Sequence, residues 1–160
     1  MIALIIGLCT CLIFIFWQDC KFRHIHVSLP VVIFVCAYLL TNYIPQNIQF
    51  IATNVLFFST TLFLLTLYMS LKNKAFLNPF KHYFGLGDLL FYVAITPLFL
   101  LYQYVLFFIL SLVFAITMQW VLKKWITKES VPLAGLSALF LTLIIVKDLL
   151  FPFQKITLIR

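Results

Sequence analysis

Charged side chains are scarce in this sequence: they make up 9% of its 160 residues, and only four of them are acidic. Glycine is equally rare, with four residues, whereas 65% of the chain is hydrophobic and 19 residues are phenylalanine. A soluble domain has about 25% charged and roughly 45–50% apolar residues. The shortage of polar side chains therefore excludes a soluble globule, a disordered chain and a nucleic-acid-binding domain. It predicts an all-α, polytopic membrane protein.

The length of six apolar segments is close to the roughly 20 residues that a transmembrane helix needs. They cover residues 2–17, 27–43, 50–71, 83–102, 104–122 and 131–150. The fourth and fifth segments meet at Gln103, where we expect the chain to reverse, because one helix over both would be about 60 Å long. We expect Pro97 to kink the fourth helix rather than end it. The sequence thus predicts one domain over residues 1–160, a bundle of about six transmembrane helices.

The basic residues predict which side of the membrane each loop faces. The chain has 11 lysine and arginine residues and a formal net charge of +7. Eight of the 11 follow the first, third and fifth segments: Lys21, Arg23, Lys72, Lys74, Lys81, Lys123, Lys124 and Lys128. Because cytoplasmic loops are enriched in basic residues, we expect these loops to be cytoplasmic and the N-terminus to lie outside. Their expected partner is the anionic lipid of the membrane surface.

Three of the four acids fall within or beside apolar segments, where an ionisable group is costly enough to be a functional candidate. Asp19, at the end of the first segment, is expected at or just inside the cytoplasmic edge. Asp88 is expected about five residues, roughly 7–8 Å, inside the same edge, because the fourth helix should begin near Tyr83 to reach a full span. Asp148 is expected near the outer interface, with Lys147 beside it but not facing it.

Asp88 is preceded by two of the rare glycines, Gly85 and Gly87, which form the motif Gly-Leu-Gly-Asp. Glycines beside a catalytic acid let an extended backbone approach and permit positive φ. A peptide bond within a membrane must be unwound before attack, because helical carbonyl groups already accept hydrogen bonds. The residues alone leave another interpretation open, a glycine-rich turn that opens the fourth helix with Asp88 as its N-cap.

Two segments resemble the type IV prepilin peptidases, a family of GxGD intramembrane aspartic peptidases. The segment that begins at Asp19 is similar to the family's first-aspartate segment, in which a basic residue follows four positions after the acid and isoleucine six positions after it. Arg23 and Ile25 match this pattern, whereas His26 stands where the family usually has proline. The resemblance extends over nearly the whole chain in the order and number of the helices.

The segment Phe84–Leu90 resembles the family's GxGD segment, although Leu90 stands where the family often has lysine. Pro132 resembles the proline at the start of the last core helix. These matches imply a short form of the family, without the N-terminal part that carries paired cysteines and accompanies methyl transfer. We therefore expect no methyltransferase activity.

The resemblance implies an intramembrane aspartic endopeptidase of the bacterial inner membrane, with its active site near the cytoplasmic face. Its substrate would be a prepilin or pseudopilin, recognised by its leader and its transmembrane helix. Asp19 and Asp88 would be the catalytic pair, and the two glycines before Asp88 would admit the substrate backbone. Pro132 and Arg23 would be supporting residues, and Arg23 can either orient a carboxylate or bind lipid headgroups.

Two neighbouring carboxylates share a proton, so one can activate water while the other protonates the leaving amine. We expect no metal and no cofactor, because two acids supply both proton transfers and His24 and His26 have no third ligand at suitable spacing. Presenilin-like and signal-peptide-peptidase-like enzymes are less suitable models, since they have more helices and a Tyr-Asp motif where this chain has Gln18-Asp19. The alternative from another class is a non-catalytic or proton-coupled small protein of a secretion or pilus machine.

Overall fold

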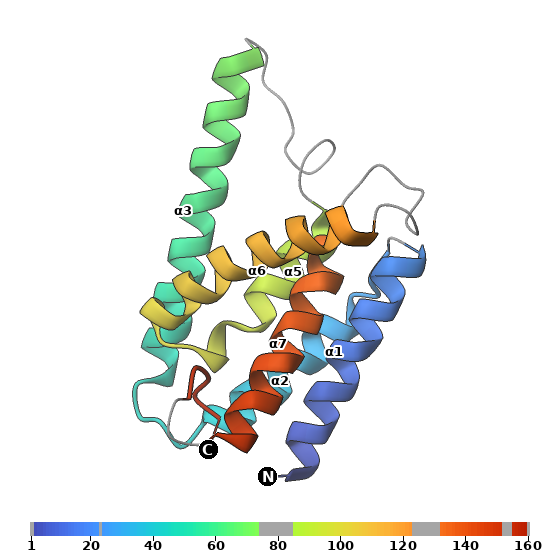
Figure 1. The fold of residues 1–160 in the computed structure, drawn as a ribbon. Helices are drawn as coiled ribbons and strands as arrows, with labels where there is room; N and C mark the ends of the chain where they lie inside the picture. The colour runs from blue at the N-terminus through green and yellow to red at the C-terminus, as the bar shows by residue number, and fades with distance from the viewer. Residues whose placement is uncertain (1, 23, 74–84, 123–131, 152–154, 160) are drawn as a thin grey trace.

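The computed structural model describes residues 2–22, 24–73, 85–122, 132–151 and 155–159 (Figure 1). The regular structure within these ranges is entirely helical. The elements are α1 (Ile2–Phe22), α2 (Ser28–Thr41), α3 (Asn47–Asn73), α5 (Leu86–Ala94), the 3-10 turn η1 (Thr96–Leu98), α6 (Leu101–Leu122) and α7 (Leu133–Leu150). The all-α fold expected from the composition is confirmed.

Four of these helices are long and apolar enough to cross a membrane: α1, α3 as far as Lys72, α6 and α7. They are compatible with the expected multi-pass membrane protein. Helix α2, with 14 residues, and the apolar segment Leu86–Leu98 are shorter than the roughly 20 residues of a full span. The predicted order of helices is present, but two of them are shorter than predicted.

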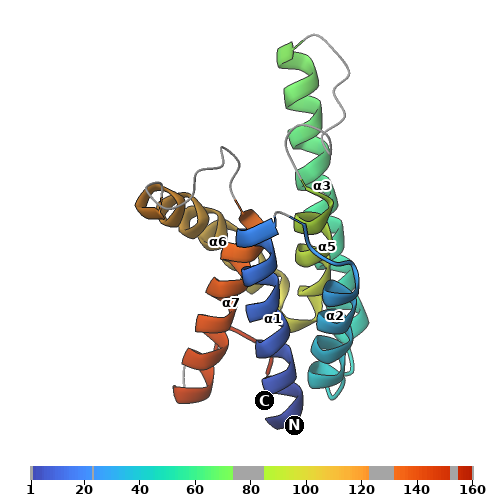
Figure 2. The same cartoon turned by 90° about the vertical axis from the view of Figure 1, so that its right-hand side faces the viewer.

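Helix α1 lies between α7 and α2, and α5 packs against α2 and α7 (Figures 1 and 2). Helix α6 crosses this group at a steep angle, and α3 extends past the other helices at the end where α1 finishes and α7 begins. The N-terminus and the C-terminus both lie at the opposite end. The shared core is apolar, and its fully buried members include Leu8, Leu12, Ile15, Ile33, Ala37, Phe91 and Leu141.

The chain reverses between η1 and α6 at Phe99 and Leu100, a few residues before the expected position at Gln103. Asn54 Nδ2, from α3, donates to the carbonyl oxygens of Thr96 at 3.0 Å and Phe99 at 2.8 Å. Gln103, in the first turn of α6, accepts a hydrogen bond from the Leu100 N–H at 3.1 Å. An interrupted helix is tolerated in a membrane when its backbone groups are satisfied in this way. Gln103 therefore stabilises the reversal, which occurs before it.

Helix α5 is shorter at both ends than the sequence suggested. It begins at Leu86, after an extended Gly85, rather than near Tyr83, which lies outside the described residues. It ends at Ala94, so Pro97 lies in the following 3-10 turn and does not kink a continuous helix. Proline has no N–H and disfavours the α conformation of the residue before it, which explains why the α-helix ends there.

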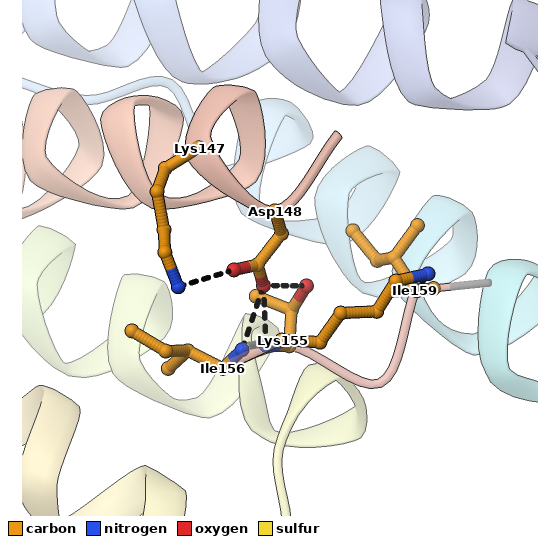
Figure 3. Close-up of polar contacts among 6 residues, drawn as sticks. Lys147, Asp148, Lys155, Ile156 and Ile159 are labelled. Carbon is orange, nitrogen blue, oxygen red and sulfur yellow. Dashed lines mark hydrogen bonds and ion pairs between the residues drawn. The ribbon is translucent and has the colours of Figure 1, made fainter. Parts of the chain in front are cut away.

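Residues 155–159 fold back against the end of the bundle where α7 finishes (Figure 3). Asp148 Oδ2 accepts hydrogen bonds from the N–H groups of Ile156 at 2.9 Å and Thr157 at 2.7 Å, and from Thr157 Oγ1 at 2.8 Å. Lys147 Nζ lies 3.3 Å from Asp148 Oδ1, and Asp148 is only 4% exposed. The expectation that Lys147 does not face Asp148 was wrong, because the lysine side chain bends back to its neighbour. The returning segment 155–159 covers the carboxylate.

Replacement of Asn54 by leucine should lower the free energy of unfolding by about 1–3 kcal/mol, because the buried carbonyl groups of Thr96 and Phe99 lose their side-chain donor. The measurement is thermal unfolding in detergent micelles. The control is Thr60→Val, since Thr60 is exposed and bonds the carbonyl group of Phe57 in its own helix. Equal stability of the two variants would contradict this role of Asn54.

Candidate active site

Asp19 is the last member of the buried stripe of helix α1. The stripe repeats at intervals of three and four residues and consists of Ile5, Leu8, Leu12, Ile15 and Asp19. Such a spacing places all its members on one helix face. Asp19 therefore faces the interior of the bundle, and only 7% of its surface is exposed. Its Oδ2 atom accepts a hydrogen bond from the backbone N–H of Gly135, in α7, at 2.7 Å.

Asp88 is the third residue of helix α5 and lies in its first turn. Its Oδ2 atom accepts a hydrogen bond from the N–H of Gly85 at 3.2 Å, the bond by which a first-turn acid caps its own helix. Its Oδ1 atom accepts a second bond from the N–H of Ala134, in α7, at 2.7 Å. The capping role that the sequence left open is thus present, although Gly85 rather than Asp88 is the N-cap. The same carboxylate also reaches a second helix.

The two carboxylates converge on the first turn of α7. Ala134 and Gly135 are its second and third residues, whose N–H groups have no acceptor within the helix. An N-cap side chain usually accepts such bonds, but the N-cap here is Pro132, which has no polar side chain. Asp19 and Asp88 take its place from two other helices. Since successive backbone nitrogens are at most about 3.7 Å apart, the two bound oxygens lie within about 9 Å of each other.

This arrangement brings together two acids that are far apart in the sequence and places them at one end of one helix. The N-terminus of a helix favours negative charge. Two negative charges at a single site nevertheless disfavour each other. The site therefore combines a helix terminus that favours negative charge with two acids close enough to influence each other.

Gly135 is a site residue that the sequence analysis did not single out. A Cβ atom at this position would lie 2.9 Å from Cβ and 3.0 Å from Oδ2 of Asp19. Glycine is therefore needed for Asp19 to reach the backbone so closely. Two features of the sequence could have indicated Gly135: it follows Pro132 by three residues, and the chain has only four glycines.

Gly85 and Gly87, which the sequence analysis assigned to backbone approach, make room in different ways. Gly85 is exposed and extended, with φ −68° and ψ 144°, so it does not use the positive φ that glycine allows. A Cβ atom at Gly85 would lie 3.1 Å from Oδ2 of Asp88. A Cβ atom at Gly87 would lie 3.0 Å from Cδ1 of Ile25. Gly85 thus gives room to the carboxylate, and Gly87 gives room to the segment between α1 and α2.

Of the two supporting residues predicted from the sequence, the structure describes only one. Pro132 is buried at the N-cap of α7, beside the two acids, whereas Arg23 lies outside the described residues. His24 and His26 are exposed. Within the described ranges, no three histidine, cysteine, aspartate or glutamate side chains come together as a possible metal site. Asp148 lies about 20 Å further along α7 and is not part of this site.

Gly135→Ala should lower the free energy of unfolding by about 1–3 kcal/mol, because its Cβ atom collides with Asp19 and displaces the carboxylate. Gly7→Ala is the control, because a Cβ atom at Gly7 would meet nothing within 4 Å. A helical alanine there should be neutral or stabilise the protein by roughly 0.5–1 kcal/mol. Unfolding curves in detergent compare the two variants, and a Gly135→Ala protein as stable as the Gly7→Ala protein would refute the close contact.

Comparison of the chain with protein-family models, with curated proteins and with solved structures finds no match. Its function is therefore inferred from its own residues. The basis for that inference is the pair of acids, one from α1 and one from α5, bound to successive amides in the first turn of α7.

Proposed function

We propose that this protein is an intramembrane aspartic endopeptidase that removes the leader of prepilins or pseudopilins. The observation that carries the proposal is the pairing of Asp19 and Asp88 on successive backbone amides. Two carboxylates at one site suffice for peptide hydrolysis, because one can serve as general base and the other as general acid. The resemblance of the two aspartate segments to the type IV prepilin peptidases supplies the substrate class.

In the proposed reaction, the ionised carboxylate removes a proton from a water molecule, which attacks the carbonyl carbon of the scissile peptide bond. The protonated carboxyl group donates a hydrogen bond to the carbonyl oxygen, and a proton then passes to the leaving nitrogen. The amides of Ala134 and Gly135 hold the two side chains, and the helix dipole of α7 stabilises the ionised one. Either Asp19 or Asp88 can begin as the base, because each is a carboxylate bound to one amide of α7.

We place the site near the cytoplasmic face of the bacterial inner membrane. Lys21 and Lys72 are exposed at the ends of α1 and α3. These ends, and the helix ends that flank the basic segments 74–81 and 123–128, lie at the same end of the bundle as the start of α7 (Figure 1). Under the positive-inside rule this end is cytoplasmic and the N-terminus lies outside. A prepilin would present its leader to the site from the cytoplasm while its transmembrane helix stays in the bilayer.

A second candidate is a non-catalytic or proton-coupled small protein of a secretion or pilus machine. It is favoured by the fact that both acids cap helices, which is a structural use of a carboxylate. A structural role as a cap and a catalytic role differ in what they require of the side chain. A cap needs an acceptor oxygen, whereas catalysis needs a group that gains and loses a proton. Asparagine keeps the first property and lacks the second.

Asp19→Asn and Asp88→Asn should each reduce leader cleavage by at least about 100-fold, because one carboxylate cannot serve as both base and acid. Both variants should still fold, since the amide oxygen of asparagine can accept the bond from α7. The measurement is co-expression with a candidate prepilin, with loss of the leader scored by mass. Asp148→Asn is the matched control, because it also replaces a buried acid that accepts backbone N–H groups.

Asp148→Asn should leave cleavage nearly intact when activity is normalised to folded protein. If Asp148→Asn were inactive while Asp19→Asn still cleaved, the assignment of the pair would be wrong. Equal activity of all three variants on a verified substrate would support the non-catalytic candidate instead.

A further inference from the structure

Tyr92 links helix α5 to both α6 and α7 within the core. It is fully buried, and its hydroxyl oxygen lies 2.8 Å from Ser111 Oγ, in α6, and 2.9 Å from Ser137 Oγ, in α7. Ser111 Oγ donates to the carbonyl oxygen of Phe108 at 2.9 Å. A serine has one hydroxyl proton, so Tyr92 donates to Ser111 and Ser137 donates to Tyr92. The three hydroxyl groups thus form a continuous chain between three helices.

The bond between Tyr92 and Ser137 lies one turn from the candidate active site. Tyr92 follows Asp88 by four residues on α5, and Ser137 follows Ala134 by three residues on α7. Residues at these spacings share a helix face, and the two intervals rise by about 6 Å and 4.5 Å. Both helices begin at the same end of the bundle and run in the same direction (Figure 1). The Asp88–Ala134 and Tyr92–Ser137 bonds are therefore neighbouring links between the same two faces.

Helix α5 depends on such links because it has nine residues, fewer than the roughly 12–15 at which an isolated helix becomes even marginally stable. Its far end is also attached. The N–H of Leu158 donates to the carbonyl oxygen of Leu98 at 2.8 Å, and the returning segment that contains Leu158 is bonded to Asp148 of α7. The position of α5 along α7 is thus set at its start, in its middle and beyond its end.

We infer that Tyr92 is a positioning residue for the candidate active site. Its hydroxyl group, bonded to Ser137, sets the register of α5 against α7 and thereby places Asp88 at the Ala134 amide. The effect on cleavage rests on the proposed function, whereas the placement of Asp88 does not require it. The link is built from hydroxyl groups in the core, where a hydrogen bond has no competition from water.

Tyr92→Phe removes this link and keeps the ring, which packs against Phe58 and Phe108. Ser137→Ala removes the same link from the α7 side and provides the same test if Tyr92→Phe does not fold. Tyr104→Phe is the matched control. Tyr104 is also fully buried, and its hydroxyl group donates to the backbone oxygen of Tyr92 at 3.0 Å, within the α5–α6 region.

The first readout is the kinetics of leader cleavage on a prepilin that the wild-type protein cleaves. Tyr92→Phe and Ser137→Ala should each lower kcat about ten-fold with KM unchanged, because a displaced acid slows the chemical step without altering substrate binding. The double variant should be no slower than Tyr92→Phe alone, since Tyr92→Phe already removes the bond to Ser137. Tyr104→Phe should stay within about two-fold of wild type. Equal kcat values for Tyr92→Phe and Tyr104→Phe would overturn the inference.

The second readout needs no substrate and follows the melting temperature. Asp88→Ala, which removes the acceptor of the Ala134 N–H, should lower it less in the Tyr92→Phe or Ser137→Ala background than in wild type, because the Asp88–Ala134 bond is already weakened there. In the Tyr104→Phe background Asp88→Ala should act as it does in wild type, and equal effects in all backgrounds would overturn the inference. If the coupling appears in a protein that cleaves no prepilin, the placement of Asp88 by Tyr92 stands and the proposed function fails.

Discussion

The first turn of helix α7 presents two backbone N–H groups that its proline N-cap cannot satisfy. Ala134 and Gly135 are buried, and a buried N–H group needs an acceptor, so the acceptors come from neighbouring helices. They are Asp19 from α1 and Asp88 from α5. This requirement accounts for the acid at the end of the apolar stripe of α1, for an acid in the first turn of α5, and for the glycine at position 135. The same two bonds leave a pair of carboxylates at one site.

Carboxylate oxygens accept backbone N–H groups at both ends of α7, but the acid and the N–H groups exchange sides. At its start, acids from other helices accept N–H groups of α7, whereas at its finish Asp148 of α7 accepts N–H groups from the returning segment 155–159. Between these ends, Ser137 bonds Tyr92. Buried polar groups are stable when they are paired, and here the pairing also aligns helices. The apolar side chains between these three sets of hydrogen bonds pack the helices together. The polar side chains set the register of the helices against one another.

Composition and hydropathy predicted the helical fold, and the scarcity of acids pointed to Asp19 and Asp88, which the structure brings together. The short α5 could not be predicted in this way, because the length argument treats each helix as crossing the bilayer alone. Asn54, which lies 42 residues before Thr96 in the sequence, bonds the carbonyl groups of the interrupted backbone. The bonds of Asp148 could not be predicted for a similar reason, since hydropathy does not show that the chain returns after α7 to form them.

If Asp19 and Asp88 activate water to hydrolyse a peptide bond, the oxygen of that water enters the product. Single-turnover cleavage by the purified protein in water enriched in ¹⁸O measures this. The protein, in detergent, is mixed in excess with a prepilin, and the released leader is analysed by mass spectrometry. The proposed mechanism predicts a single cut and one ¹⁸O atom in the new carboxyl group of the leader, because the attacking oxygen comes from water. A prepilin that stays intact with folded protein, or a leader that carries no ¹⁸O, would contradict it.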